Sequence, residues 1–207
     1  MNFDDRSITP KREDCVYTSC YCEENVWKLC DFIKTEGTAP LDQLFVVFIS
    51  NDKKAVPLWK QKTGCGDEPV IWDYHVVLLH ASTEREPLIY DLDSVMPFPC
   101  TLEQYATKAL RSDHEIKPQF HRMLRVVPSA CYLKHFASDR SHMKDAFGQW
   151  KMPPPHYPAI SNTACQMNLN EFISMDAHVG WGRIFTLDNF LLSFMGEMPT
   201  ENRRVAI

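Results

Sequence analysis

One stretch organises the fold that we expect for this chain: Cys20-Tyr21-Cys22-Glu23-Glu24-Asn25-Val26-Trp27-Lys28-Leu29-Cys30. Its apolar and thiol side chains recur with the spacing of one helical face, at Cys22, Val26, Leu29, Cys30 and Ile33. The pattern predicts a helix whose buried stripe begins with Cys22. Unpaired N–H groups and the positive end of the dipole at a helix start favour a thiolate, and the same N–H groups can hold an oxyanion. Cys22 is therefore a candidate nucleophile at a helix N-terminus.

The acids beside this cysteine act against its ionisation. Glu23 and Glu24 disfavour a further negative charge close by. A free thiol is only slightly ionised near neutral pH, so a nucleophilic Cys22 needs a basic partner elsewhere in the chain. Without such a partner, Cys22 is typical of the small, inert cysteines that pack in protein cores.

Length and charge limit the kinds of protein to consider. With 207 residues the chain can bury roughly 70% of its unfolded surface, which is enough for one full core. We expect a single catalytic domain at 15–195, between a poorly ordered segment at 1–14 and a loose tail at 196–207. The formal net charge of -5 provides no basic field for nucleic acid or for an anionic membrane. We therefore expect a small or peptidic partner.

The eight cysteines and the lack of an export signal indicate a reducing compartment. No apolar run approaches the length of a membrane span, and residues 1–14 are polar and acidic, unlike a signal sequence. We expect the cytosol, and also the nucleus, with the cysteines as free thiols. No C-x-x-C pair and no glycine-rich phosphate loop occurs, so we expect neither a metal nor a cofactor.

Runs of apolar and β-branched residues predict several strands, at 44–49, 56–59, 70–80, 87–95 and 120–127. Only a short polar turn separates 70–80 from 87–95, so these two strands should form an antiparallel hairpin. Thr101 and Gln104 have the form of a capping box that starts a helix reaching about residue 111, and Thr186 can cap a last helix. A cysteine-bearing helix followed by hairpins and further helices predicts an α+β fold, with an antiparallel sheet packed against helices.

A histidine on the long strand is the candidate base. Side chains alternate between the two faces of a strand, so His75 and His80 must point in opposite directions, and only one of them can serve a given site. His75 lies near the polar beginning of the strand. A structural, hydrogen-bonded role is the alternative for a single strand histidine.

The partner strand supplies two acids, Asp91 and Asp93, that can orient this histidine. Both share the parity of His75. One register places Asp93 opposite His75, and a register shifted by two residues places Asp91 there. The residues alone leave both acids open. Cysteine on a helix start, histidine on a strand and an acid on the next strand form the arrangement of papain-like and transglutaminase-like catalysts, which are α/β-type proteins.

Longer segments carry a resemblance to a known family. Residues 20–30, 70–79, 89–93, 136–145 and 167–175 resemble the protein N-terminal glutamine amidohydrolase family, within a similarity that spans about 15–190. The resemblance implies a monomeric cysteine hydrolase of transglutaminase-like build that converts N-terminal glutamine of proteins or peptides to glutamate and releases ammonia. In the N-degron pathway this step makes a substrate for arginylation. The family's triad falls on Cys22, His75 and Asp91.

Selectivity for a chain terminus also requires an acceptor for the substrate's α-ammonium group. The candidate carboxylates are Glu23, Asp73, Asp93 and Asp139, although acids are usually solvated surface groups. Tyr21 and Trp72 are candidates for the walls of a narrow substrate pocket, although aromatic residues are more often part of a core.

Two other functions fit the same residues. A cysteine peptidase or a transglutaminase would share the architecture and the Cys–His–acid arrangement. A non-catalytic module that binds peptide N-termini would need the pocket but not the thiol. The partner expected in the first case is a protein or peptide with a free N-terminal glutamine.

Overall fold

The computed structural model describes residues 8–196, and its centre is an antiparallel sheet. Six strands lie in the order β6-β5-β4-β1-β7-β8. Their bounds are β1 Leu44–Ser50, β4 His75–His80, β5 Leu88–Tyr90, β6 Cys100–Thr101, β7 Met123–Pro128 and β8 Arg183–Thr186. A separate two-stranded sheet pairs β2 (Val56–Leu58) with β3 (Val70–Trp72).

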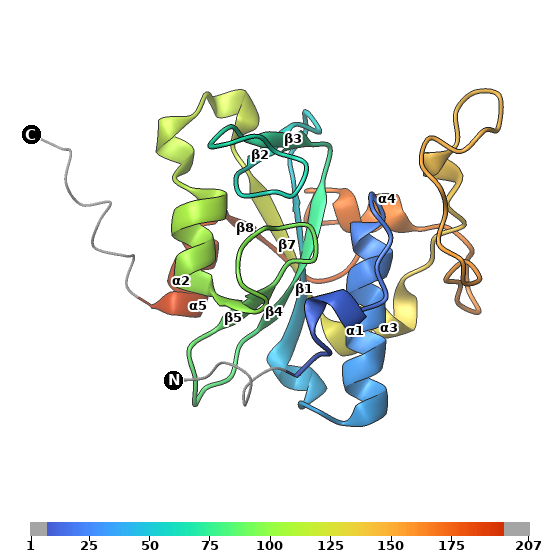
Figure 1. Cartoon of the computed structure of the whole chain (residues 1–207), viewed down its shortest axis with the longest axis horizontal. Coiled ribbons are helices and arrows are strands. Elements are labelled where there is room, and N and C mark those ends of the chain that lie inside the picture. The colour runs from blue at the N-terminus through green and yellow to red at the C-terminus, as the bar shows by residue number, and fades with distance from the viewer. Residues whose placement is uncertain (1–7, 197–207) are drawn as a thin grey trace, which may run out of the picture.

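Helices cover both faces of the six-stranded sheet (Figure 1). On one side lie α1 (Cys22–Glu36), α3 (Ser129–His135) and α4 (Leu169–Ile173). On the other side lie α2 (Leu102–Tyr105), which continues as a π-helical turn over Ala106–Leu110, and α5 (Leu187–Met195). The predicted α+β fold with an antiparallel sheet packed against helices is confirmed. Its papain-like or transglutaminase-like relationship stays a prediction.

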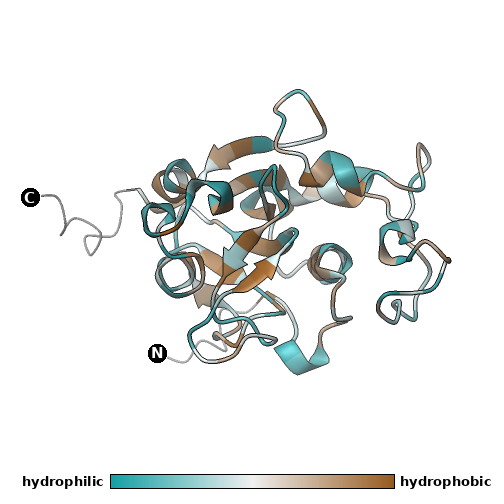
Figure 2. Cartoon of the chain, turned by 90° about the horizontal axis from the view of Figure 1, so that it is seen from above, coloured by the Kyte–Doolittle hydropathy of each residue, from teal (hydrophilic) through white to brown (hydrophobic). Residues whose placement is uncertain are grey.

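The alternation of side chains along β1 and β4 divides the core in two. Val46 and Phe48 point to the α1 side, where they join the apolar stripe of α1. Val47 and Ile49 point to the opposite side, where α2 and α5 cover them. Because both faces of β1 are covered, its sequence is an almost continuous apolar run. Figure 2 shows the hydrophobic colours concentrated on these strands between the helices.

The helix α1 begins where the sequence predicts and ends before a glycine. The apolar stripe from Cys22 to Ile33 is buried as predicted. Gly37 adopts a left-handed conformation, with φ of 64°, and its N–H donates to the carbonyl of Ile33. A glycine is suited to this position because it has no Cβ to clash.

The predicted strand 70–80 is wrong as a single element. The chain breaks at Asp73 and Tyr74, so that β3 pairs with β2 while β4 starts at His75 in the main sheet. At the break, the Oδ1 atom of Asp73 accepts a hydrogen bond of 3.0 Å from the backbone N–H of Tyr74. This local bond competes with a continuous ladder, and an Asp in that role is common at turns.

Other elements agree with the prediction in part. The hairpin of 70–80 with 87–95 exists as β4 with β5, but β5 ends at Tyr90. Thr101 and Thr186 accept hydrogen bonds from backbone N–H groups three residues later, and both cap helices as expected. The strand expected at 120–127 is β7. Two short elements bordered by proline and glycine, α3 and β8, were not predicted.

The ends of the chain differ from the expected division. Residues 1–7 and 197–207, which belong to the two expected loose segments, lie outside the described residues. Residues 8–14, however, pack on the domain, because Ile8 is buried in the core and Arg12 donates to the carbonyl of Met96 at 2.6 Å. The single domain at 15–195 stays a prediction. Within residues 8–196, none of the helices combines the length and the apolar character that a membrane crossing requires.

Candidate active site

Cys22 is the first residue of α1 and lies over the start of β4. Its side chain is buried, with 5% of its surface exposed. The backbone N–H of Val76, the residue after His75, lies within hydrogen-bonding reach of the Cys22 sulfur. The thiol itself donates to the Oε2 atom of Glu23 at 3.7 Å. The fold therefore brings the candidate nucleophile to the strand that carries the candidate base.

The resting form of Cys22 is a thiol, which differs from the thiolate that the helix start favours. Burial raises the pKa of Cys22 well above its ordinary value, and the negative charges of Glu23, Asp93 and Asp73 raise it further. The N–H of Val76 acts in the opposite direction but does not outweigh them. In a buried site, loss of hydration outweighs the half-charge of a helix dipole. A nucleophilic Cys22 must therefore lose its proton during the reaction.

His75 is fully buried and held by two contacts. Its Nε2 atom lies 3.0 Å from the Oδ1 atom of Asp91, and its ring stacks on Trp72 with 5.0 Å between the centroids. Because a carboxylate only accepts, Nε2 carries the hydrogen of the neutral imidazole and Nδ1 has the free lone pair. Nδ1 is buried and has no hydrogen-bond partner within residues 8–196. This atom is thus available to take a proton.

Asp91 is the acid that contacts His75, although the strand register alone favours Asp93. Leu78 pairs with Tyr90, and continuation of this register would place Asp93 opposite His75. The chain leaves the strand after Tyr90, and the Asp91 side chain turns back, where its Oδ1 atom also accepts from the N–H of Asp93 at 2.9 Å. The structure thus selects between the two acids that the residues left open.

Two further side chains fix the second oxygen of this acid. Oδ2 of Asp91 accepts from the hydroxyl of Tyr105 at 2.8 Å and from the amide of Gln61 at 3.3 Å. Burial raises the pKa of Asp91, but His75 and the hydrogen bonds from Tyr105 and from the N–H of Asp93 outweigh it and lower the value to about 2. Asp91 is therefore a carboxylate at neutral pH. Sequence reasoning missed Tyr105 and Gln61, and neither stands in a motif that could reveal its contact.

The charge of Asp91 in turn affects His75. Burial lowers the pKa of His75, but the negative charges of Asp91, Asp93 and Glu23, together with the hydrogen bond to Asp91, raise it above its ordinary value overall. A base with this property accepts a proton readily and holds a positive charge during a reaction. His75 and Asp91 together form a base whose cationic form is stabilised.

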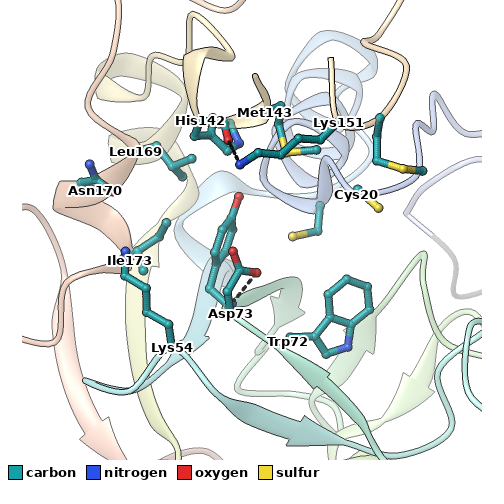
Figure 3. A pocket seen from close by; sticks show the side chains of 13 residues that line it. Cys20, Lys54, Trp72, Asp73, His142, Met143, Lys151, Leu169, Asn170 and Ile173 are labelled. Atoms are coloured by element: carbon teal, nitrogen blue, oxygen red, sulfur yellow. Dashed lines mark hydrogen bonds between the residues drawn. The ribbon is translucent and has the colours of Figure 1, made fainter. Parts of the chain in front are cut away.

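A pocket of about 490 Å³ opens at Cys22 (Figure 3). Its walls come from the start of α1, the break between β3 and β4, the loop around His142 and the helix α4. The lining residues are Cys20, Cys22, Lys54, Trp72, Asp73, Tyr74, His142, Met143, Lys151, Met152, Leu169, Asn170 and Ile173. Among these described residues, Asp73 is the sole carboxylate, and Figure 3 shows it within the pocket. Trp72 and Asp73 thus occupy the predicted site, as wall residues.

Glu23 lies directly behind the pocket wall. Its side chain is fully buried, and its Oε2 atom accepts a hydrogen bond of 2.9 Å from the hydroxyl of Tyr74. Its Oε1 atom lies 3.5 Å from the Nε2 atom of His142 and has no hydrogen-bond partner in the described part of the chain. Tyr74 and His142 both line the pocket. A buried carboxylate with an unsatisfied oxygen is costly, so a positively charged partner would stabilise it.

The remaining candidates lie away from the pocket. Tyr21 is fully buried and donates from its hydroxyl to the carbonyl of Met152 at 3.3 Å. Asp93 accepts a 2.6 Å hydrogen bond from Tyr17, and the exposed Asp139 accepts from the N–H of Ser141 at 2.8 Å. None of these three candidates belongs to the pocket wall formed by the described residues. The expectation that Tyr21 walls the pocket is therefore wrong: Tyr21 positions the segment that carries Met152.

A buried ion pair joins the nucleophile helix to the loop above the pocket. Arg140 binds both carboxylate oxygens of Glu24, each at 2.8 Å. The same guanidinium donates to the carbonyls of Pro155 and Tyr157 at 3.3 and 3.0 Å. A bidentate pair with further bonds fixes geometry well. This pairing of a helix acid with a distant loop arginine has no local sequence signal.

The acids near His75 also bear on metal binding. His75, Asp91 and Asp93 bring potential ligand atoms within 4.8 Å of one another. These atoms already serve the protein, because Asp91 binds His75 and Tyr105 while Asp93 binds Tyr17. The cluster is therefore a hydrogen-bond network, and we assign it no metal.

Comparison with known proteins places this geometry in a family. Residues 17–194 match the model of the family described as N-terminal glutamine amidase. A protein of Danio rerio named protein N-terminal glutamine amidohydrolase is 56% identical over 187 residues, which cover 90% of this chain and 93% of the relative. The Homo sapiens protein of the same name is 56% identical over 186 residues, 90% of this chain and 91% of the relative. The Drosophila melanogaster protein of that name is 45% identical over 188 residues, 90% and 92% of the two chains. The chain therefore belongs to the N-terminal glutamine amidase family.

Proposed function

We propose that this protein converts the N-terminal glutamine of proteins and peptides to glutamate and releases ammonia. The observation that carries the proposal is the buried pair of His75 and Asp91, in which Nε2 lies 3.0 Å from Oδ1. His75 directly precedes Val76, whose backbone N–H lies within hydrogen-bonding reach of the Cys22 sulfur. Such a pair matches the chemistry that a protonated thiol needs, because the thiol must lose its proton as it attacks. Membership of the family supports glutamine as the substrate residue.

The first half of the reaction forms a thioester. The Nδ1 atom of His75 takes the thiol proton, and the Cys22 sulfur attacks the side-chain amide carbon of the glutamine. The resulting oxyanion lies near the start of α1, where the backbone N–H of Cys22 is a donor. The carbon–nitrogen bond then breaks, and His75 returns the proton to the leaving nitrogen, which departs as ammonia.

The second half of the reaction restores the enzyme. Water attacks the thioester carbon while Nδ1 of His75 takes a proton from it. The carbon–sulfur bond breaks, the thiol regains its proton from His75, and glutamate remains at the N-terminus of the product. Asp91 holds the imidazole in the tautomer that leaves Nδ1 free and stabilises its positive charge in both halves.

A peptide series tests this proposal. Four peptides of one sequence begin with glutamine, acetylated glutamine, a glycine before the glutamine, or asparagine, and ammonia release is measured together with the mass of each product. We expect ammonia and a mass gain of about 1 Da from the first peptide alone, because glutamine becomes glutamate. Cleavage products would indicate a peptidase, cross-linked products a transglutaminase, and binding without any product a non-catalytic module.

The setting of the protein is part of the same proposal. All eight cysteines lie within the described residues and none forms a disulfide there. Free thiols suit a reducing compartment, so we infer that the protein is cytosolic and nuclear. We further infer, from the family that it resembles, a monomer whose product enters the N-degron pathway. Fractionation of cells and light scattering of the purified protein test these two points, and secretion or a stable dimer would contradict them.

A further inference from the structure

The pocket restricts where the substrate's α-ammonium group can lie. This inference rests on the proposed function, because the reacting atom must then be the side-chain amide carbon of glutamine. Four covalent bonds join that carbon to the α-nitrogen, so the two atoms are at most about 5 Å apart. With the carbon at the Cys22 sulfur, the ammonium group must lie within the pocket that begins at Cys22.

Within this pocket, Asp73 offers the matching acceptor. It is the sole carboxylate among the described lining residues, and its exposed side chain forms no ion pair within residues 8–196. Its Oδ1 atom is held by the N–H of Tyr74 at 3.0 Å, which fixes the orientation of the carboxylate and leaves Oδ2 for a ligand. The two lining lysines, Lys54 and Lys151, are exposed, and Lys151 donates to the carbonyl of His142 at 3.1 Å.

A second feature, directly behind the pocket wall, also favours a positive charge nearby. The buried Glu23 has one oxygen without a hydrogen-bond partner in the described residues, and its other oxygen accepts from Tyr74 and from the Cys22 thiol. After burial, the charge of this carboxylate is the next largest cause of the raised pKa of Cys22. A negative charge beside a nucleophile hinders catalysis unless another charge compensates it when the substrate binds.

We propose that Asp73 binds the α-ammonium group of the substrate, and that the charge of this ammonium offsets Glu23 and so frees the Cys22 thiol to react. A free N-terminus is then needed twice, for binding and for activation of the nucleophile. An internal glutamine has a neutral amide nitrogen at that position, so it provides neither contribution. The enzyme thus avoids a reactive thiol in the absence of a terminal substrate.

The charges around Cys22 determine how each substitution should affect the ionisation of the thiol and the binding of a cationic ligand. They are the carboxylates of Glu23, Asp73 and Asp93, the imidazoles of His75 and His142, and the ammonium groups of Lys54 and Lys151. Removal of a negative charge from this set makes the thiol easier to ionise, because burial and the acids both raise the pKa of Cys22. The same removal at Asp73 weakens the hold on a cationic ligand.

The experiment combines two measurements on Asp73→Asn, Glu23→Gln and the control Asp52→Asn. Asparagine and glutamine keep the hydrogen-bond acceptors, and Asp52 is an exposed acid in the neighbouring hollow. The first measurement is alkylation of Cys22 by iodoacetamide at pH 7, followed by mass spectrometry. The second is the affinity of a glutamine peptide with a free or an acetylated N-terminus, by calorimetry in the Cys22→Ala background.

We expect opposite effects on the two measurements. Alkylation of Cys22 becomes about fivefold faster in Glu23→Gln and changes in the same direction, but less, in Asp73→Asn. The free peptide binds about a hundredfold more weakly to Asp73→Asn, while binding of the acetylated peptide is unchanged. Asp52→Asn matches the parent protein in both measurements.

Other results overturn the inference. If Asp73→Asn keeps the preference for the free N-terminus, Asp73 is not the anchor. If Glu23→Gln slows alkylation, Glu23 serves as a base rather than a restraint on the thiol. A general loss of structure would slow or accelerate alkylation at the other buried cysteines as well, and thermal unfolding of each variant detects it. Neither measurement requires turnover, so failure of the proposed function, seen as no ammonia from the parent protein, is distinguished from failure of the anchor.

Discussion

Two carboxylates of the site, Asp91 on the strand side of Cys22 and Glu23 on the pocket side, differ in how completely their oxygens are hydrogen-bonded. On the strand side, Asp91 uses both oxygens for protein hydrogen bonds, from His75, Tyr105, Gln61 and the N–H of Asp93. On the pocket side, Glu23 has an oxygen without a hydrogen-bond partner in the described residues. A satisfied network holds one geometry, whereas an unsatisfied one favours a ligand that completes it. The strand side therefore suits chemistry, and the pocket side suits recognition.

The largest test of this division is Cys22→Ala. We expect ammonia release to fall by at least about ten-thousandfold, because no other group forms the thioester. Binding of the N-terminal glutamine peptide should persist, since the pocket carboxylates remain. Calorimetry and an ammonia assay check the two halves. Residual turnover near that of the parent protein would place the chemistry elsewhere.

The next test compares the two acids on the strand side. Asp91→Asn should lower kcat about a thousandfold, because the amide cannot stabilise a cationic His75 and can favour the wrong tautomer. Asp93→Asn is the matched control, since Asp93 accepts from Tyr17 and forms no hydrogen bond with His75 within residues 8–196. We expect it to retain at least about a tenth of the activity. The reverse order of effects would make Asp93 the orienting acid.

A smaller effect should follow from Tyr105→Phe. This change removes the 2.8 Å hydrogen bond to the Oδ2 atom of Asp91 but leaves the ring in place. Support of this kind is typically worth about tenfold in activity. Steady-state kinetics should show the change in kcat, with KM for the peptide unaffected because Tyr105 lies outside the pocket wall of the described residues. A change confined to KM would contradict the division between the two sides.

The pH profile gives the most gradual test. His75 must be neutral to take the thiol proton, and its pKa is raised, so kcat/KM should fall as the pH decreases through a value above 6.5. The alkaline limb should follow loss of the substrate's α-ammonium charge, near about pH 8. Asp91→Asn removes a charge that raises the pKa of His75, so it should move the acid limb to lower pH. If the acid limb of Asp91→Asn does not move, the ionisation of His75 does not control the rate.

Periodicity predicted the elements that carry strong local patterns. The apolar stripe of α1, the continuous run of β1 and the threonine caps at Thr101 and Thr186 are all local, and each occurs as expected. The break at Asp73 was not predicted, because residues 70–80 contain no glycine or proline and read as one strand. In the folded protein β3 pairs with β2 in a separate sheet, and these tertiary contacts override the local strand pattern.

The candidate site was predictable in its members but not in its contacts. Parity alone left Asp91 and Asp93 open, and the observed register would have favoured Asp93. The choice depends on how the chain leaves the strand after Tyr90, which no strand rule describes. Tyr105, Gln61 and Arg140 reach the site across long sequence separations, so no spacing in the sequence reveals them.

The buried ion pair between Glu24 and Arg140 has a consequence for protein engineering. It holds the start of the loop that follows Arg140 against α1. The far end of this loop is exposed to solvent, since 88% of the surface of Phe147 is accessible. Replacements at that end should therefore leave the fold and the reactive centre undisturbed, which makes it a suitable place to attach a label or a tag.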